Sequence, residues 1–222
     1  MVEDYLSDRE QEEALRRWWQ ENWRWILGGI ALGLVLLAAW YYWQHYKTQR
    51  AHQASAMFAE YQAAGADEAA AQSALDRLIA EHPKSAYTAH ARLDQAKKHV
   101  DAQRYDEAAA QLRAVADTSK DDELAWIARL RLARVLIQQG KHDEVLSLLK
   151  PEKAGAFAAR VREVRGDALF AKGDTEGARA EYAAALAANP DAQTDRQLLE
   201  MKLQQVGEGA QSSAPTAAAA VE

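Results

Sequence analysis

The hydrophobic pattern of the chain has two parts: one uninterrupted apolar run near the N-terminus, and a longer region in which apolar residues recur at helical spacing. The apolar run covers residues 25–43, WILGGIALGLVLLAAWYYW, and contains no charged residue. As a helix rising about 1.5 Å per residue, a run of this length spans a hydrocarbon core of roughly 30 Å. The pattern therefore predicts one transmembrane helix over residues 25–43.

Aromatic residues gather at both ends of the apolar run. They are Trp18, Trp19, Trp23 and Trp25 toward its start, and Trp40, Tyr41, Tyr42, Trp43 and Tyr46 toward its end. Amphipathic rings favour the two membrane interfaces, so these residues would hold the helix at its depth. The main alternative is a cleaved signal peptide, but 24 residues rich in acidic side chains precede the run. A signal peptide begins instead with a short basic region.

The basic residues that flank the run predict its orientation. Four precede it and two follow it closely: Arg9, Arg16, Arg17, Arg24, Lys47 and Arg50. Because Lys and Arg are retained on the cytoplasmic side, residues 1–24 are expected to form a cytoplasmic N-terminal tail. The rest of the chain then lies across the membrane, which in a bacterium is the periplasm.

Two short patterns lie within and ahead of the predicted span. Gly29 and Gly33 form a G-x-x-x-G pair, which permits close approach of another helix and makes them candidates for a transmembrane contact. The alternative is that glycine is simply frequent in membrane helices. Residues 7–10, SDRE, have the pattern of a capping box and predict a helix start near Ser7.

After the span, the chain repeats one pattern four times. Small residues that would seat one helix against another recur at intervals of 37, 37 and 33 residues: Ala59, Ala96, Ala133 and Gly166. Twelve residues after each lies a second small or slight residue: Ala71, Ala108, Val145 and Ala178. Four residues later comes an apolar one: Leu75, Leu112, Leu149 and Tyr182. The repeated offsets predict four equivalent helix pairs.

Turn signals agree with this division. Gly140 and Gly173 lie between the two helices of the clearest copies, where glycine readily takes the positive φ that ends a helix. Pro83 and Pro190 close the first and last copies. Helix-turn-helix units of this length are typical of tetratricopeptide repeats. One pair alone cannot bury its apolar face, so the pairs are expected to stack into an all-α, tetratricopeptide-like domain over residues 44–206.

The end of the repeat region has its own signals. A final helix at about residues 191–205 carries Leu198, Leu199 and Leu203 and is expected to cap the open end of the stack. Beyond Gly207 the chain consists mainly of Ala and Ser, with little that could be buried. Residues 207–222 are therefore predicted to form a disordered tail.

Composition and motifs exclude several classes of function without identifying one. The formal net charge of -6 argues against nucleic-acid binding, and the absence of Cys excludes disulfides and thiolate chemistry. The six His residues show no H-x-x-x-H or H-E-x-x-H spacing, and there is no G-x-x-x-x-G-K or G-x-G-x-x-G phosphate loop. We therefore expect no enzyme activity, no cofactor and no metal, and predict a domain that binds proteins.

Two basic groups are candidates for protein binding. They are Arg129, Arg131 and Arg134 in one predicted helix and Arg160, Arg162 and Arg165 in another. The alternative for both is a solvated face laced with neighbouring carboxylates. In a stack of helix pairs the first helices line the concave surface. Lys97, Arg134, Arg160 and Asp167 are accordingly the residues expected to line a protein-binding groove.

Several segments resemble a known family. They are residues 165–169, RGDAL; 172–174, KGD; 177–179, GAR; 130–135, LRLARV; 17–19, RWW; 21–22, EN; and the stretch 44–61. Together they resemble the YfgM-like family of ancillary subunits of the bacterial SecYEG translocon. The resemblance covers about residues 8–205, and the Ala- and Ser-rich tail departs from it.

The resemblance implies a bacterial inner-membrane protein with its N-terminus in the cytoplasm and its helical domain in the periplasm. It also implies two partners, the SecYEG translocon and a membrane-anchored periplasmic chaperone of prolyl-isomerase type. Emerging polypeptides are a third expected partner, because an anchored stack of repeats near the channel exit would raise the local concentration of binding surface for them. The main alternative is a membrane-anchored tetratricopeptide scaffold that regulates an envelope signalling protein. Both functions use the same fold, so the fold does not choose between them.

Overall fold

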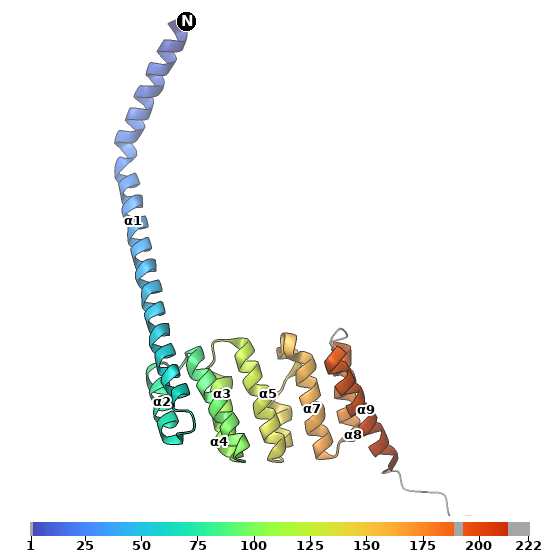
Figure 1. Cartoon of the computed structure of the whole chain (residues 1–222). Helices are drawn as coiled ribbons and strands as arrows, with labels where there is room; N and C mark the ends of the chain where they lie inside the picture. The colour runs from blue at the N-terminus through green and yellow to red at the C-terminus, as the bar shows by residue number, and fades with distance from the viewer. Residues whose placement is uncertain (1, 189–192, 213–222) are drawn as a thin grey trace, which may run out of the picture. The chain divides into compact units, whose positions relative to one another are not determined.

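The computed structural model describes residues 2–188 and 193–212, with side chains for residues 10–188 and 196–207. These residues form helices joined by turns, with no strand among them, so the predicted all-α class is confirmed (Figure 1). The α-helices are α1 Val2–Ala63, α2 Glu68–Glu81, α3 Ala86–Asp101, α4 Tyr105–Thr118, α5 Asp122–Gln138, α6 His142–Leu148, α7 Ala158–Lys172, α8 Thr175–Ala188 and α9 Gln193–Ser212. Two 3-10 turns, η1 Pro151–Lys153 and η2 Gly155–Phe157, join α6 to α7.

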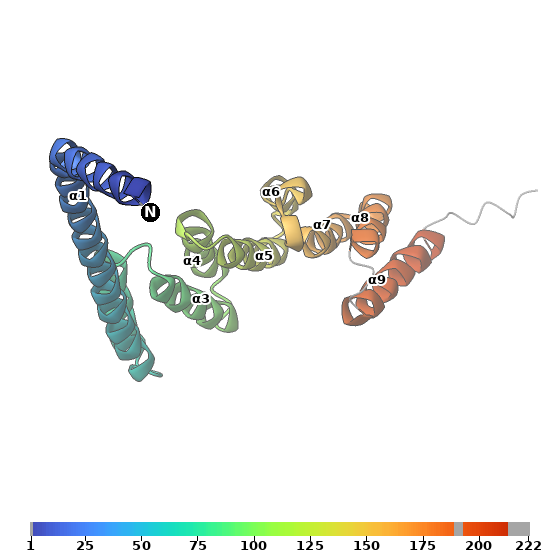
Figure 2. The same ribbon diagram turned by 90° about the horizontal axis from the view of Figure 1, so that it is seen from above.

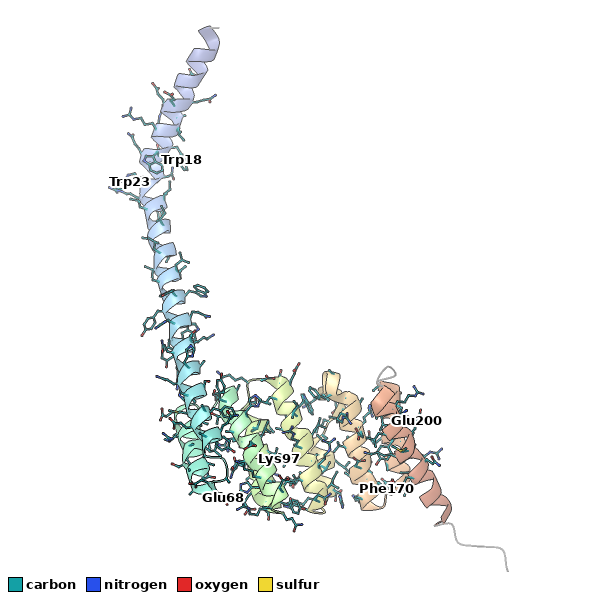
Figure 3. All side chains as sticks on the ribbon, viewed as in Figure 1. Trp18, Trp23, Glu68, Lys97, Phe170 and Glu200 are labelled. Carbon is teal, nitrogen blue, oxygen red and sulfur yellow. The ribbon has the colours of Figure 1, made fainter. Side chains whose placement is uncertain are left out.

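The chain divides into two units, residues 1–53 and residues 54–222. The described part of the first unit belongs to α1. This helix begins at Val2, ahead of the predicted capping box, so residues 2–24 that precede the apolar run are helical. Within the described chain, α1 is the one helix long and apolar enough to cross a membrane. Its large apolar side chains are exposed, as a lipid-facing segment requires, and Trp18 and Trp23 are labelled in Figure 3.

Gly29 and Gly33 lie on this exposed helix. No atom stands within 4 Å of where a Cβ would be at either position. The face that carries the G-x-x-x-G pair is therefore open to another helix, and its use as a contact stays a prediction.

The second unit is a stack of helix pairs in chain order: the last turns of α1 with α2, α3 with α4, α5 with α6, and α7 with α8, followed by α9 (Figures 1 and 2). Its apolar core forms three clusters, one around Leu75, a large central one around Leu132, and one around Tyr182. This is the tetratricopeptide-like arrangement that the repeated offsets predicted.

The repeated positions lie where the helices meet. Of the small residues that recur at intervals of 37, 37 and 33, Ala96, Ala133 and Gly166 are buried. The residues twelve positions after them, and the apolar residues four positions later still, are buried in all four repeats. Ala59 is the exception, because it is exposed, while Ala54 and Tyr61 are the buried residues at this end of α1. Helix α3 packs against α2, α4 and α5, whereas the last turns of α1 bury Ala54 and Tyr61 in the cluster that they share with α2 and Ala91 of α3.

The turns inside the pairs use left-handed backbone at corresponding positions. Gly140 and Gly173 have φ of +73° and +90°, so their predicted role is confirmed. Gln103, one repeat before Gly140, has φ of +59° and is the non-glycine residue with positive φ in the described chain. A side chain is strained in this conformation, so the second repeat contains a turn that glycine would form more easily.

Charged pairs join these turns from one repeat to the next. A carboxylate in the first turn of α2, α4 and α6 meets a basic residue of the following repeat: Glu68 with Arg104 at 2.6 Å, Asp106 with Lys141 at 3.4 Å, and Asp143 with Lys172 at 2.5 Å. The side chains are largely exposed, so each pair contributes little to stability. The series instead marks the register between successive repeats.

The closing helix is longer than predicted. Leu199 and Val206 of α9 are buried against Ala178 and Tyr182, while Leu198 is exposed. The helix continues to Ser212, so the predicted boundary at Gly207 lies inside it. Pro190 and residues 213–222 lie outside the described residues, as does most of the predicted tail.

Candidate protein-binding groove

The first helices of successive pairs, α3, α5 and α7, leave two hollows between them. The hollow between α3 and α5 has a volume of about 330 Å³. Its floor is apolar and is formed by Leu93, Ala96, Val100, Leu112 and Val135. Its rim carries Lys97, Arg131 and Arg134, so the hollow combines buried apolar walls with cations at the edge.

The second hollow lies between α5 and α7 and has a volume of about 590 Å³. Ile127, Leu130 and Phe157 supply apolar surface, and Arg160 stands on its α7 side. Arg131 and Arg134 line this hollow as well as the first. The shared arginines join the two hollows into one surface across α3, α5 and α7, which we call the arginine groove.

Three of the four predicted groove residues line this surface. Lys97 of α3, labelled in Figure 3, lines the first hollow, Arg134 lines both, and Arg160 lines the second. Asp167 lines neither, since it accepts hydrogen bonds from Tyr182 Oη at 2.8 Å and Lys202 Nζ at 2.7 Å. The carboxylate of Asp167 therefore holds α9 in place and is not offered to the groove.

The cations of the groove differ in their partners. Lys97 pairs with Asp101 at 2.8 Å and Arg160 with Glu163 at 2.6 Å. Arg131 and Arg134 are exposed and make no hydrogen bond or ion pair with any residue the structure describes. Sequence reasoning noted Arg131 in a basic group but did not place it in the groove, because charge spacing does not show which arginines are already paired.

The remaining arginines of the two basic groups are structural. Arg129 donates to the carbonyl of Ala116 at 2.9 Å and lies over the ring of Trp126. Arg162 and Arg165 donate to Glu181 of α8 at 3.3 and 2.7 Å. For these three, the interpretation as a charged face paired within the domain is the better one.

A buried carboxylate anchors the C-terminal end of the stack. Glu163 of α7 is 4% exposed and accepts hydrogen bonds from Arg160 at 2.6 Å and Lys202 at 2.9 Å. Burial raises the pKa of Glu163, but the hydrogen bonds and positive charges of Lys202 and Arg160 outweigh it and leave the pKa below its ordinary value. The ionised carboxylate therefore stabilises the contact between α7 and α9.

Both ends of the stack contain a Tyr, Asp and Lys cluster. At the first end, Tyr61 Oη donates to Asp94 at 2.7 Å, and Lys98 Nζ lies 5.0 Å from the centre of the Tyr61 ring. At the other end, Tyr182, Asp167 and Lys202 repeat the arrangement. Burial, followed by the hydrogen bond to a carboxylate, raises the pKa of both Tyr61 and Tyr182. Both hydroxyls therefore remain protonated donors that tie terminal helices to the stack.

The described residues contain no group of three or more His, Asp or Glu side chains placed to hold a metal ion. What the arrangement offers is an apolar surface with cationic edges, which suits recognition of another polypeptide.

Comparison with known proteins agrees with the tetratricopeptide-like fold. The family model described as a tetratricopeptide repeat-like domain matches residues 16–208. The ancillary SecYEG translocon subunit of Escherichia coli is 36% identical over 186 residues, covering 82% of this chain and 89% of that protein. The chain belongs to this family. The resemblance drawn from the sequence is therefore confirmed.

Other members of the family are similar along nearly their whole length. The ancillary SecYEG translocon subunit of Haemophilus influenzae is 33% identical over 201 residues, covering 90% of this chain and 98% of that protein. That of Neisseria gonorrhoeae is 28% identical over 202 residues, covering 90% and 97%. No solved structure matches the chain. These relatives are named as ancillary subunits, and the family model describes a tetratricopeptide repeat-like domain, which is the fold that the sequence predicted.

Proposed function

We propose that this chain is a protein-binding subunit of the Sec translocon in the bacterial inner membrane, and that it assists transfer of emerging proteins to periplasmic chaperones. The arginine groove is the observation that carries this proposal, because it joins an apolar hollow and a second hollow of mixed lining, with unpaired cations between them, on a stack of helices. Relatives named as ancillary SecYEG translocon subunits supply the translocon as partner.

The orientation follows from the flanking charges. The basic residues ahead of residues 25–43 favour a cytoplasmic N-terminus, and residues 44–206 then form a periplasmic domain. Gly29 and Gly33, whose helix face is open, are the proposed contact with a transmembrane helix of the translocon.

The mechanism is one of local concentration. A domain tethered beside the channel meets each emerging segment as it leaves. A groove that binds weakly is therefore occupied far more often in the tethered domain than in the same domain released into solution. The proposed partners of the groove are emerging polypeptides and a membrane-anchored chaperone of prolyl-isomerase type. Binding and release then pass the segment onward without any chemical step.

The proposal is tested by photo-crosslinking of the full chain in intact membranes. One probe replaces Gly33, with Val35 on the other side of the helix as its control. A second replaces Ile127, which lines the second hollow and leaves the groove cations in place, with exposed Arg113 of α4 as its control. Translocon subunits at Gly33, and a chaperone or nascent chains at Ile127, are expected; equal products at the control positions would contradict the proposal.

The alternative is a scaffold that holds an envelope signalling protein at the membrane. It predicts that the Ile127 probe captures one sensor or response regulator and no nascent chain. The same experiment therefore separates the two functions by the identity of the captured protein.

A further inference from the structure

Nine of the twelve described arginines between residues 54 and 207 have a partner in the chain. Arg77, Arg92, Arg104, Arg113, Arg129, Arg160, Arg162, Arg165 and Arg196 all donate to a carboxylate, an amide or a main-chain carbonyl. The exceptions among the described residues are Arg131, Arg134 and Arg179. Two of these three stand together on α5, at the junction of both hollows.

The position of this pair is unfavourable for the domain alone. Residues three apart on a helix share a face, and like charges placed so destabilise the helix. The nearest cations of the groove are already neutralised, Lys97 by Asp101 and Arg160 by Glu163. No carboxylate of the described domain neutralises Arg131 or Arg134, so an external anion would relieve a repulsion that the fold leaves in place.

We propose that the arginine groove binds an extended polypeptide segment in which acidic and apolar side chains alternate along the groove. Carboxylates of the segment pair with Arg131 and Arg134, and apolar side chains enter the hollows on either side of them. This rests on the proposed function and specifies the chemistry of what the groove accepts.

The spacing of the helices limits the segment. Packed helices lie about 8–10 Å apart, so a path from α3 across α5 to α7 covers roughly 16–20 Å. An extended chain advances about 3.3 Å per residue, so five or six residues cross the groove. Residues two apart in an extended chain face the same side, so an acidic residue at the middle of the segment, with apolar residues two positions to either side, places a carboxylate at the central arginines and an apolar side chain in each hollow.

Charge and apolar surface together favour a polypeptide over other anions. The whole chain carries a formal charge of -6, which repels an extended polyanion such as a nucleic acid. A membrane surface would neutralise the arginines but would leave the floor at Leu93, Val100 and Val135 without an apolar partner. A short segment with acidic and apolar side chains pairs with the arginines of the rim and covers the apolar floor.

The test uses the full chain in nanodiscs of zwitterionic lipid and a fluorescent synthetic peptide in which Leu and Asp alternate at every second position, with Ser between them. Binding is measured by anisotropy for the unmodified chain, for Arg131→Gln with Arg134→Gln, and for Arg179→Gln as the matched control. Empty nanodiscs correct for partition into lipid. A second peptide, with Asn in place of each Asp, separates charge recognition from apolar binding.

We expect the double variant to weaken binding of the acidic peptide by about tenfold or more, because two charge-assisted hydrogen bonds are lost. Arg179→Gln should bind the acidic peptide as tightly as the unmodified chain does. The double variant should bind the Asn peptide no more weakly than it binds the Asp peptide. Added salt should weaken binding of the acidic peptide to the unmodified chain. The melting temperature of the double variant should be unchanged or slightly higher, since neither arginine has a partner in the described domain and their mutual repulsion is removed.

Equal binding of the Asp and Asn peptides, or an equal loss in Arg179→Gln, would overturn the proposal. So would anionic vesicles that bind through Arg131 and Arg134 while the acidic peptide does not bind. These outcomes leave the photo-crosslinks from Ile127 unaffected, because those report contact with any client. The proposed function can therefore stand when this inference fails.

Discussion

The aromatic ring of Tyr182 lies against the backbone of Gly166. A Cβ placed on Gly166 would stand 2.6 Å from Cδ1 of the ring. The ring is itself fixed, since Tyr182 is 2% exposed and its hydroxyl donates to Asp167, the residue after the glycine. This contact brings α7 and α8 together and places Asp167 within reach of Lys202 on α9.

Gly166→Ala is expected to destabilise the domain. The buried ring cannot yield to the new methyl group without disturbing its hydrogen bond, so we expect a loss of about 1–3 kcal/mol in the free energy of unfolding. Urea denaturation of the full chain in detergent, followed by circular dichroism, measures the loss. Gly207→Ala is the control, because nothing lies within 4 Å of its Cβ position in α9 and alanine should be neutral or stabilising there.

Gln103→Gly is expected to stabilise the domain. Gln103 has φ of +59° at the position that Gly140 occupies in the next repeat, and glycine removes the strain of a side chain in this region. The gain should be about 0.5–1 kcal/mol in the free energy of unfolding, after the greater freedom of glycine in the unfolded chain is counted. The same urea titration measures it. Gly140→Gln should show a change of opposite sign, and a loss in both variants would contradict the interpretation.

Lys202→Met is expected to loosen α9. Lys202 donates hydrogen bonds to Glu163 and Asp167, and its loss leaves the nearly buried Glu163 with Arg160 as its cationic partner in the described chain. We expect a destabilisation of about 1–3 kcal/mol, seen as faster hydrogen exchange in α9. Lys172→Met, which removes a largely exposed pair with Asp143, is the control and should change little.

The contact between Glu163 and Lys202 should stabilise the domain less as the pH falls. The pKa of Glu163 is below its ordinary value in the folded chain, so the unfolded state binds the proton more readily. The stabilisation is present at neutral pH and is lost as the pH falls through the folded pKa, below 4.5. Lys202→Met should therefore reduce the acid sensitivity of α9 exchange, and equal acid sensitivity in both proteins would contradict the role of the pair.

His99 predicts a second loss of stability in mild acid. Burial, followed by the charge of Arg104, lowers the pKa of His99 below 6.5, although Glu107 and Glu68 act in the opposite direction. Its Nδ1 is buried without a hydrogen-bond partner in the structure. Stability should be full above pH 6.5 and decline as the pH falls toward the folded pKa, because the unfolded state takes up the proton first. Urea midpoints at pH 7.5 and 5.5 should differ less in His99→Asn than in the unmodified chain, with exposed His90→Asn as the control.

The helical stack was predictable because its signal is local and repeated. Leu75, Leu112 and Leu149 are buried at the positions expected from their shared offsets. Ala59 departed from the pattern, because at this end of the stack Ala54 and Tyr61 are the residues of α1 that are buried against α2 and Ala91 of α3. The periodicity of a sequence records which residues are equivalent, but equivalent residues at an end and in the middle meet different surroundings.

The candidate groove was predictable in part. Lys97, Arg134 and Arg160 line it, since the first helices of a repeat stack face the same side. Asp167 was assigned to the groove on the same reasoning, and the structure assigns it to α9 instead. Its partner Lys202 lies 35 residues away, at a distance in sequence that no helical spacing relates.

The sequence by itself therefore determined the apolar run, the all-α class, the register of the repeats and the family, because each depends on residue type and spacing along one chain. The tertiary structure decided which charges remain free. Arg129, Arg131 and Arg134 are close together in sequence, yet Arg129 is bound to Ala116 while the other two face the hollows. The reason is that pairing depends on side chains brought together from different helices, and a binding surface consists of the groups that this packing leaves without a partner.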